Sequence, residues 1–189
     1  IRAPRAAAQS LQKAQSHVVI GFPSVSVTDP RRRPMELIST ILSGQSGRLF
    51  LELRDKQSLA YSVSSMTVEG TDPGYFAVYM ATSPEKVSQA IDGIRAQLQR
   101  LCDQTVSDDE LSRAREYLIG THEIGLQRTS ARTSTIALNS SYGLGPLHHL
   151  DYAKEISAIT PADLLTTARA IIDFNRSVSV LVGPQATEV

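Results

Sequence analysis

The sequence has little of what stapled secreted domains and membrane proteins are built from. A single cysteine, Cys102, stands among 189 residues, so an internal disulfide is excluded and we expect a small core residue there. No apolar run approaches the roughly 20 residues of a membrane-spanning helix. Nineteen basic residues balance nineteen acidic ones, which gives no sign of nucleic-acid binding. What is left is an ordinary globular composition, 41% hydrophobic and 20% charged, in a chain long enough to bury a core without cross-links.

The motifs of the common hydrolases are also missing. A zinc peptidase needs two histidines one helical turn apart and a glutamate that polarises a water molecule. Leu126 stands where the second histidine would follow His122-Glu123, and His148 and His149 are adjacent, so they point to different faces of a helix. A nucleophile elbow and a phosphate loop are likewise absent. We therefore predict no metal and no cofactor in this chain, and we expect its four histidines to be structural or solvent-exposed.

Two segments are distinguished by composition. Residues 1–16 are rich in Ala, Gln and Arg with little periodicity, and we predict an interdomain linker there, followed by one domain over residues 17–189. The basic run at residues 31–33 is enclosed by Pro30 and Pro34, which favours a solvated loop over a binding patch.

Hydrophobic periodicity predicts the remaining elements. Apolar or β-forming runs indicate four strands, at residues 17–23, 60–69, 75–81 and 177–183. Turn residues at 70–74 join the middle two into an antiparallel hairpin. Helical spacing with start and stop signals indicates helices at 34–42, about 48–56, 84–101, 108–124, 129–142, 149–157 and 161–172. This order predicts an α+β fold, a two-layer sandwich of a mostly antiparallel sheet covered by helices.

One segment combines a cation and a phenol. Arg54 lies near the end of the predicted helix at 48–56, and Tyr61 lies near the start of the next strand. A tight connection would bring both to the same rim, where they could bind a peptide carbonyl or donate to an oxyanion generated elsewhere. The alternative is structural: an Arg favoured by the dipole at a helix C-terminus and a Tyr packed on the sheet.

The same segment resembles the second-half signature of the pitrilysin/insulinase metallopeptidases, which include the mitochondrial processing peptidases. The matching letters are S-G-R-L-F at residues 46–50, E-L-R at 52–54 and L-A-Y-S-V at 59–63. Further similarity runs from the strand at residue 17 through the hairpin and residues 110–115 to V-L-V-G at 180–183. The loop at residues 43–47 is shorter than the glycine-rich loop of the processing peptidases, so presequence-specific recognition is not implied.

The resemblance implies a LuxS/MPP-like metallohydrolase half that pairs with a zinc-bearing homologous domain across a chamber. That partner, on the same polypeptide or a separate subunit, would hold zinc through H-x-x-E-H. By analogy, Tyr61 would donate to the substrate oxyanion and Arg54 would hold the substrate backbone, so this chain alone would be an inactive, zinc-free domain of an endopeptidase acting on peptides.

Two other functions remain open at this stage. Some members of the resembled family are catalytically inactive scaffolds, in which Arg54 and Tyr61 would be structural. Reading the gene and its neighbours for H-x-x-E-H separates the two, because a scaffold needs no such partner. A binding module unrelated to proteolysis has only a generic helical surface in its favour. The compartment, bacterial periplasm or cytoplasm, is left undetermined by the sequence.

Overall fold

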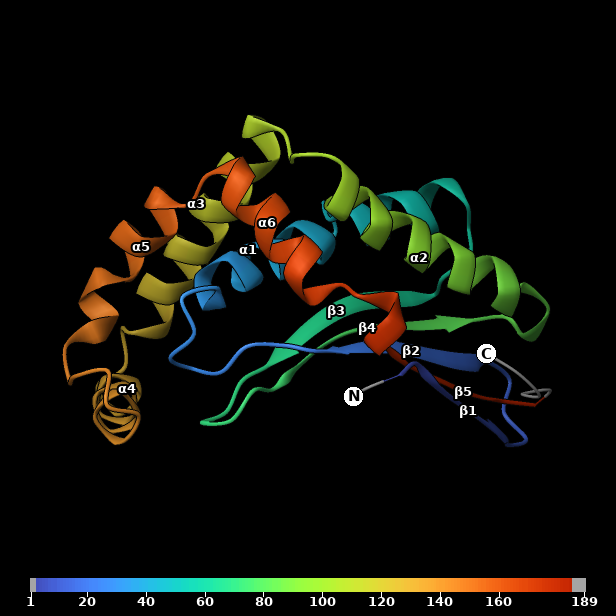
Figure 1. Ribbon diagram of the computed structural model, residues 1–189, viewed down its shortest axis with the longest axis horizontal. Helices are drawn as coiled ribbons and strands as arrows, with labels where there is room; N and C mark the ends of the chain where they lie inside the picture. Colours follow the sequence, from blue (N-terminus) through green and yellow to red (C-terminus); the bar gives the residue numbers. More distant parts are fainter. Residues whose placement is uncertain (1–2, 185–189) are drawn as a thin grey trace.

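The computed structural model describes residues 3–184, which form one mixed sheet with helices packed on one of its faces (Figure 1). The strands are β1 (Arg5–Ser10), β2 (Ser16–Pro23), β3 (Ser62–Val68), β4 (Tyr75–Thr82) and β5 (Val178–Gly183). Their order in the sheet is β1-β5-β2-β4-β3. β1 runs parallel to β5, and the other neighbours are antiparallel. The predicted α+β class and the mostly antiparallel sheet are therefore confirmed.

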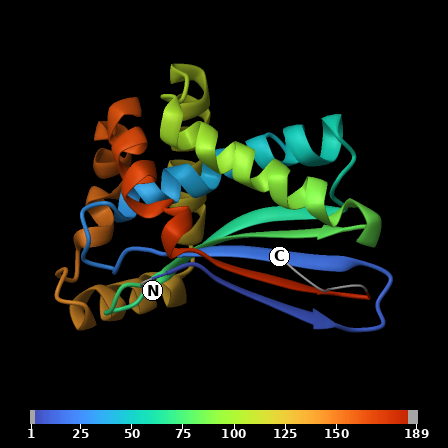
Figure 2. The ribbon, with the colours of Figure 1, turned by 45° about the vertical axis from the view of Figure 1, so that its right-hand side comes forward.

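The helices follow the predicted order. They are α1 (Arg32–Leu42), η1 (Phe50–Lys56), η2 (Pro84–Lys86), α2 (Val87–Asp103), α3 (Asp108–Gly125), α4 (Thr129–Ser141), η3 (His148–Asp151), α5 (Tyr152–Ala158), α6 (Pro161–Ile171) and η4 (Phe174–Arg176). Serine and threonine signals mark two of the starts, because Ser107 and Thr160 each form a reciprocal capping box. Figure 2 shows most of the helices above the sheet, whereas α4 lies low beside one end of it and η1 lies at the opposite end of the molecule.

The core lies between the sheet and its helices. Strand alternation sends one set of side chains to the helices, including the fully buried Val18, Ile20 and Met80. From the helical layer, Leu37, Ile38, Ile94 and Leu98 are also fully buried. Cys102 is buried on α2, as predicted, and burial raises the pKa of its thiol above the ordinary value. Packing between the sheet and the helices thus fixes the position of the elements that carry the predicted site.

Part of the segment predicted as a linker, residues 5–10, lies in the sheet. They form β1, whose register with β5 runs from Arg5↔Val178 to Ser10↔Gly183. All six residues are exposed on both faces, so the strand lacks the apolar alternation by which strands are recognised in a sequence. This part of the chain is built into the sheet. Whether residues 1–16 also connect this domain to another stays a prediction, and residues 1–2 and 185–189 lie outside the described residues.

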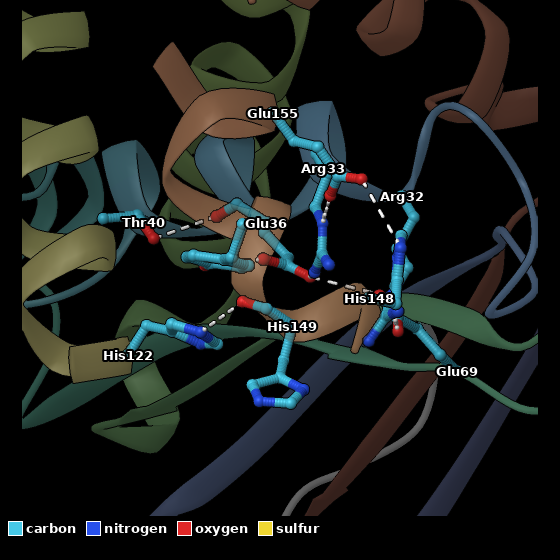
Figure 3. Close-up of polar contacts among 10 residues, drawn as sticks. Arg32, Arg33, Glu36, Thr40, Glu69, His122, His148, His149 and Glu155 are labelled. Carbon is cyan, nitrogen blue, oxygen red and sulfur yellow. Dashed lines mark hydrogen bonds and ion pairs between the residues drawn. The ribbon is translucent and has the colours of Figure 1, made fainter. Parts of the chain in front are cut away.

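The basic run at 31–33 is also corrected, since two of its arginines open α1 instead of lying in a solvated loop. The Arg32 Nε lies 2.6 Å from Glu69 Oε2, and the Arg33 Nε lies 2.8 Å from Glu155 Oε2. Figure 3 shows these carboxylates meeting the arginines from distant segments. Glu36, one turn along α1, also pairs with Arg33 at 2.7 Å. The arginines therefore connect α1 to the β3–β4 turn and to α5.

An ion pair connects the segment just before η1 with the start of α3. The guanidinium of Arg48, only 7% exposed, donates to both carboxylate oxygens of Glu110 at 2.7 and 2.9 Å. Glu110 also closes the capping box with Ser107. The hydrogen bond from Arg48 is the main reason that the pKa of Glu110 falls to about 2, against an opposing effect of burial. The pair therefore fixes Arg48, two residues before η1, to the start of α3.

The lowered pKa predicts a loss of stability in acid. A carboxylate whose pKa is lower in the folded chain stabilises the fold above its ordinary pKa, and this contribution fades as pH falls from about 4.5 to about 2. Between pH 7 and pH 3 we expect the wild type to lose roughly 1–2 kcal/mol of this contribution, allowing for solvent around a partly exposed carboxylate. Urea unfolding at pH 7 and pH 3 of the wild type and Glu110→Gln measures it. The stability gap between the two should narrow at pH 3; a gap independent of pH would contradict the prediction.

Candidate active-site rim

Arg54 is carried by η1, a single π-helical segment between α1 and β3. The predicted helix is present, but its hydrogen-bond register is π, a rare form that is frequent at functional sites. Leu53 anchors it, being fully buried against α2. This close contact requires a glycine at position 93, because a Cβ there would lie only 2.7 Å from Leu53 Cδ2. The anchor leaves the neighbouring Arg54 on the exposed side of η1.

The connection from η1 to Tyr61 is held by polar contacts at several points. The Leu59 N–H donates to the Leu53 carbonyl at 2.8 Å, and the Thr82 hydroxyl donates to the Leu59 carbonyl at 2.5 Å. Ser58 takes a left-handed backbone with φ of 50°, which turns the chain sharply. The Tyr61 N–H then donates to the Ala81 carbonyl at 3.1 Å. The start of β3 is therefore fixed relative to the end of η1.

The structure brings Arg54 and Tyr61 together, as the short connection predicted. The guanidinium carbon of Arg54 lies 5.8 Å from the centre of the Tyr61 ring and 4.9 Å from that of Phe50. Tyr61 is 72% exposed, so its hydroxyl is accessible to a molecule that approaches the rim. Cation–π contacts of this kind orient the guanidinium without consuming its hydrogen-bond donors. Phe50 also belongs to this arrangement and was not predicted to do so.

The rim can bind and stabilise charge, but it offers no base for hydrolysis. A guanidinium and a phenol supply donors for a carbonyl or an oxyanion. Within residues 3–184, no group of three or more His, Cys, Asp or Glu side chains could hold a metal ion. In the same range, no helix is long and apolar enough to cross a membrane.

The histidines at the far end of the molecule belong to a polar cluster (Figure 3). The His122 ring stacks on Tyr152 with centroids 4.1 Å apart, and Arg33 lies 4.5 Å from the centre of the same tyrosine ring. The Tyr152 hydroxyl donates to Glu36 at 2.8 Å, and burial raises the pKa of this phenol well above its usual range. The cluster joins α1, α3 and α5, which is a structural role.

The chain is similar to known proteins over most of its length. Residues 4–118, more than half of the chain, match the family described as the peptidase M16 inactive domain. An uncharacterised zinc protease of Streptomyces coelicolor is 35% identical over 171 residues, which cover 90% of this chain and 37% of that protein. An uncharacterised zinc protease of Rickettsia bellii is 25% identical, over 90% of this chain and 41% of that protein. The chain thus spans about two fifths of these relatives.

Solved structures show the same fold. The peptidase M16 inactive domain from Pseudomonas fluorescens superposes with a TM-score of 0.85 at 19% identity, covering 97% of this chain and 44% of that one. A protease from Helicobacter pylori gives a TM-score of 0.86 at 20% identity, over 97% of this chain and 44% of that one. The α+β fold predicted from the sequence agrees with both.

Proposed function

Because this chain belongs to the peptidase M16 family as an inactive, zinc-free domain, we propose that it completes a zinc endopeptidase by presenting Arg54 and Tyr61 to a partner's metal site. The zinc-bearing partner would be a homologous half of the same protein, on the same polypeptide or as a separate subunit. Support comes from the length of the relatives, zinc proteases of which this chain matches about two fifths.

The observation that carries the proposal is the shared rim of Arg54 and Tyr61. Their side chains converge from η1 and from the residue just before β3, held by Leu53 beneath and by the Ser58 turn between them. Two donors that a rigid scaffold holds and leaves exposed suit a substrate carbonyl better than they suit core packing, because burial contributes little at Tyr61.

The roles follow from the chemistry of each group. Zinc bound on the partner half supplies an activated water for attack on a peptide carbonyl. The Tyr61 hydroxyl would donate to the oxygen of that carbonyl as it gains negative charge. Arg54 would hold the substrate backbone through its guanidinium donors, oriented by the rings of Phe50 and Tyr61. The substrates would be peptides or unfolded segments that fit between the two halves.

Separating the halves tests the division of labour. Purified alone, this chain should bind no stoichiometric zinc and cleave no quenched fluorescent peptide, because it lacks the ligands that would generate a nucleophile. Metal analysis after dialysis and a peptidase assay with and without chelator measure both properties. The complete protein, which carries both halves, is the positive control. Chelator-sensitive cleavage by the isolated chain would refute the proposed division.

A further inference from the structure

The two edges of the sheet are treated differently by the rest of the chain. At the β3 edge, the Ser65 N–H donates to the Ser43 hydroxyl at 2.8 Å instead of to a strand. The Ser65 hydroxyl in turn bonds the Ser39 carbonyl at 3.0 Å. The end of α1 therefore covers the middle of this edge. At the β1 edge, within residues 3–184, no further strand pairs with β1.

Alternation along β1 decides which backbone groups are free. The Arg5 N–H donates to the Ser177 carbonyl at 3.0 Å, and the Leu11 N–H donates to the Gly183 carbonyl at 2.9 Å. In a parallel pair, alternate residues direct both their N–H and C=O to the same neighbour. The odd-numbered residues of β1 therefore bond β5. The groups directed to the outer edge belong to Ala6, Ala8 and Ser10.

This outer edge has few of the features that keep an exposed strand from pairing. Natural edge strands are shortened, bulged, or carry Pro or inward-pointing charges. β1 has six residues in continuous register with β5, without a bulge or a proline. Three consecutive alanines, at positions 6–8, leave room for a neighbouring backbone on either face. A strand so open and so regular fits another strand.

We propose that the outer edge of β1 receives a sixth strand, contributed by the zinc-bearing half of the complete protein. This inference rests on the proposed function for the existence of that half. The relatives are long enough to contain such a strand, because about three fifths of their length lies outside the part that this chain matches. Backbone pairing with Ala6, Ala8 and Ser10 would join the two halves into one sheet.

Residue-level hydrogen exchange on the complete protein tests the sixth strand without any catalytic assay. The amides of Ala7 and Gln9, bonded to β5, serve as internal references. In the paired state, the amides of Ala6, Ala8 and Ser10 should exchange as slowly as these references, and at least about tenfold more slowly than free amides. Fast exchange at the even positions beside slow exchange at the odd ones would overturn the proposal, whatever the protein's peptidase activity.

Ala8→Pro gives the matching perturbation. Proline removes an outward N–H that β5 does not use, so the β1–β5 pairing should persist. Exchange at Ala6 and Ser10 should then accelerate about tenfold or more, together with one segment of the zinc-bearing half, which identifies the sixth strand. Ala8→Thr keeps the N–H and should leave exchange unchanged. Protection of the even positions that grows with protein concentration would indicate a second copy of this chain and would also overturn the proposal.

Discussion

Tyr61→Phe in the complete protein should lower turnover by about 10²–10³-fold, the usual effect of removing one oxyanion donor. The substitution deletes a single hydroxyl from a ring that is 72% exposed. Folding and zinc content should therefore be unchanged, because neither depends on that hydroxyl. Because the donor acts on charge that develops during the reaction, kcat should fall while KM changes little. Steady-state kinetics on a quenched peptide, with zinc measured on the same sample, gives all of these quantities.

Tyr117→Phe is the matched control for this experiment. Tyr117 is 64% exposed on α3, close to the exposure of Tyr61, but it has no place at the rim. It should retain wild-type kcat and KM. If Tyr61→Phe also retained wild-type turnover, the role assigned to Tyr61 would be lost. A complete protein with no peptidase activity and no zinc would instead favour the inactive scaffold.

Glu110→Gln should cost about 3 kcal/mol of the free energy of unfolding at neutral pH. The substitution keeps the shape and the capping ability of the side chain, since Gln also closes a capping box. What it removes is the countercharge of Arg48, a guanidinium that is 7% exposed. Leaving one partner of a buried ion pair uncompensated typically costs 3–5 kcal/mol. We place this case at the lower end, because the Glu110 side chain is 25% exposed.

A double-substitution cycle separates the loss of the pair from the isolated charge. Arg48→Met removes the cation, and Arg48→Met with Glu110→Gln removes both charges. Urea unfolding should show the double variant to be more stable than Glu110→Gln alone, because no buried charge is then left without a partner. Strictly additive effects would show that the two side chains do not interact. Asp109→Asn, at an 80% exposed carboxylate on the same helix, controls for charge alone and should change stability by less than about 0.5 kcal/mol.

The sequence predicted most of the fold because its signals are local. Capping boxes at Ser107 and Thr160 marked helix starts, and turn residues between β3 and β4 marked the hairpin. β1 was missed because exposure on both faces removes the alternation on which strand prediction depends. The arginines at 32 and 33 were misplaced for the opposite reason. Two flanking prolines indicated a loop, whereas the carboxylates that hold the arginines come from residues far along the chain.

The candidate site was only partly accessible to sequence reasoning. The tight connection between the helix that carries Arg54 and the strand that follows Tyr61 predicted the convergence of these two side chains. The π register of η1 and the ring of Phe50 beside Arg54 depend on tertiary packing, such as the close contact of Leu53 with Gly93. No periodicity in the sequence encodes such a contact. The catalytic roles stay a prediction, because they also depend on a partner half.

The place of β5 in the sheet has a consequence for how the chain folds. β5 is the last described strand to be synthesised, yet it lies between β1 and β2. Until β5 is made, β1 has no partner among the described strands, and only β2, β4 and β3 can assemble. Pairing residues 5–10 with 178–183 closes a loop of almost the whole chain, and contacts so distant in sequence slow folding. During synthesis, β1 should therefore lack its β5 partner until residues 178–183 have been made.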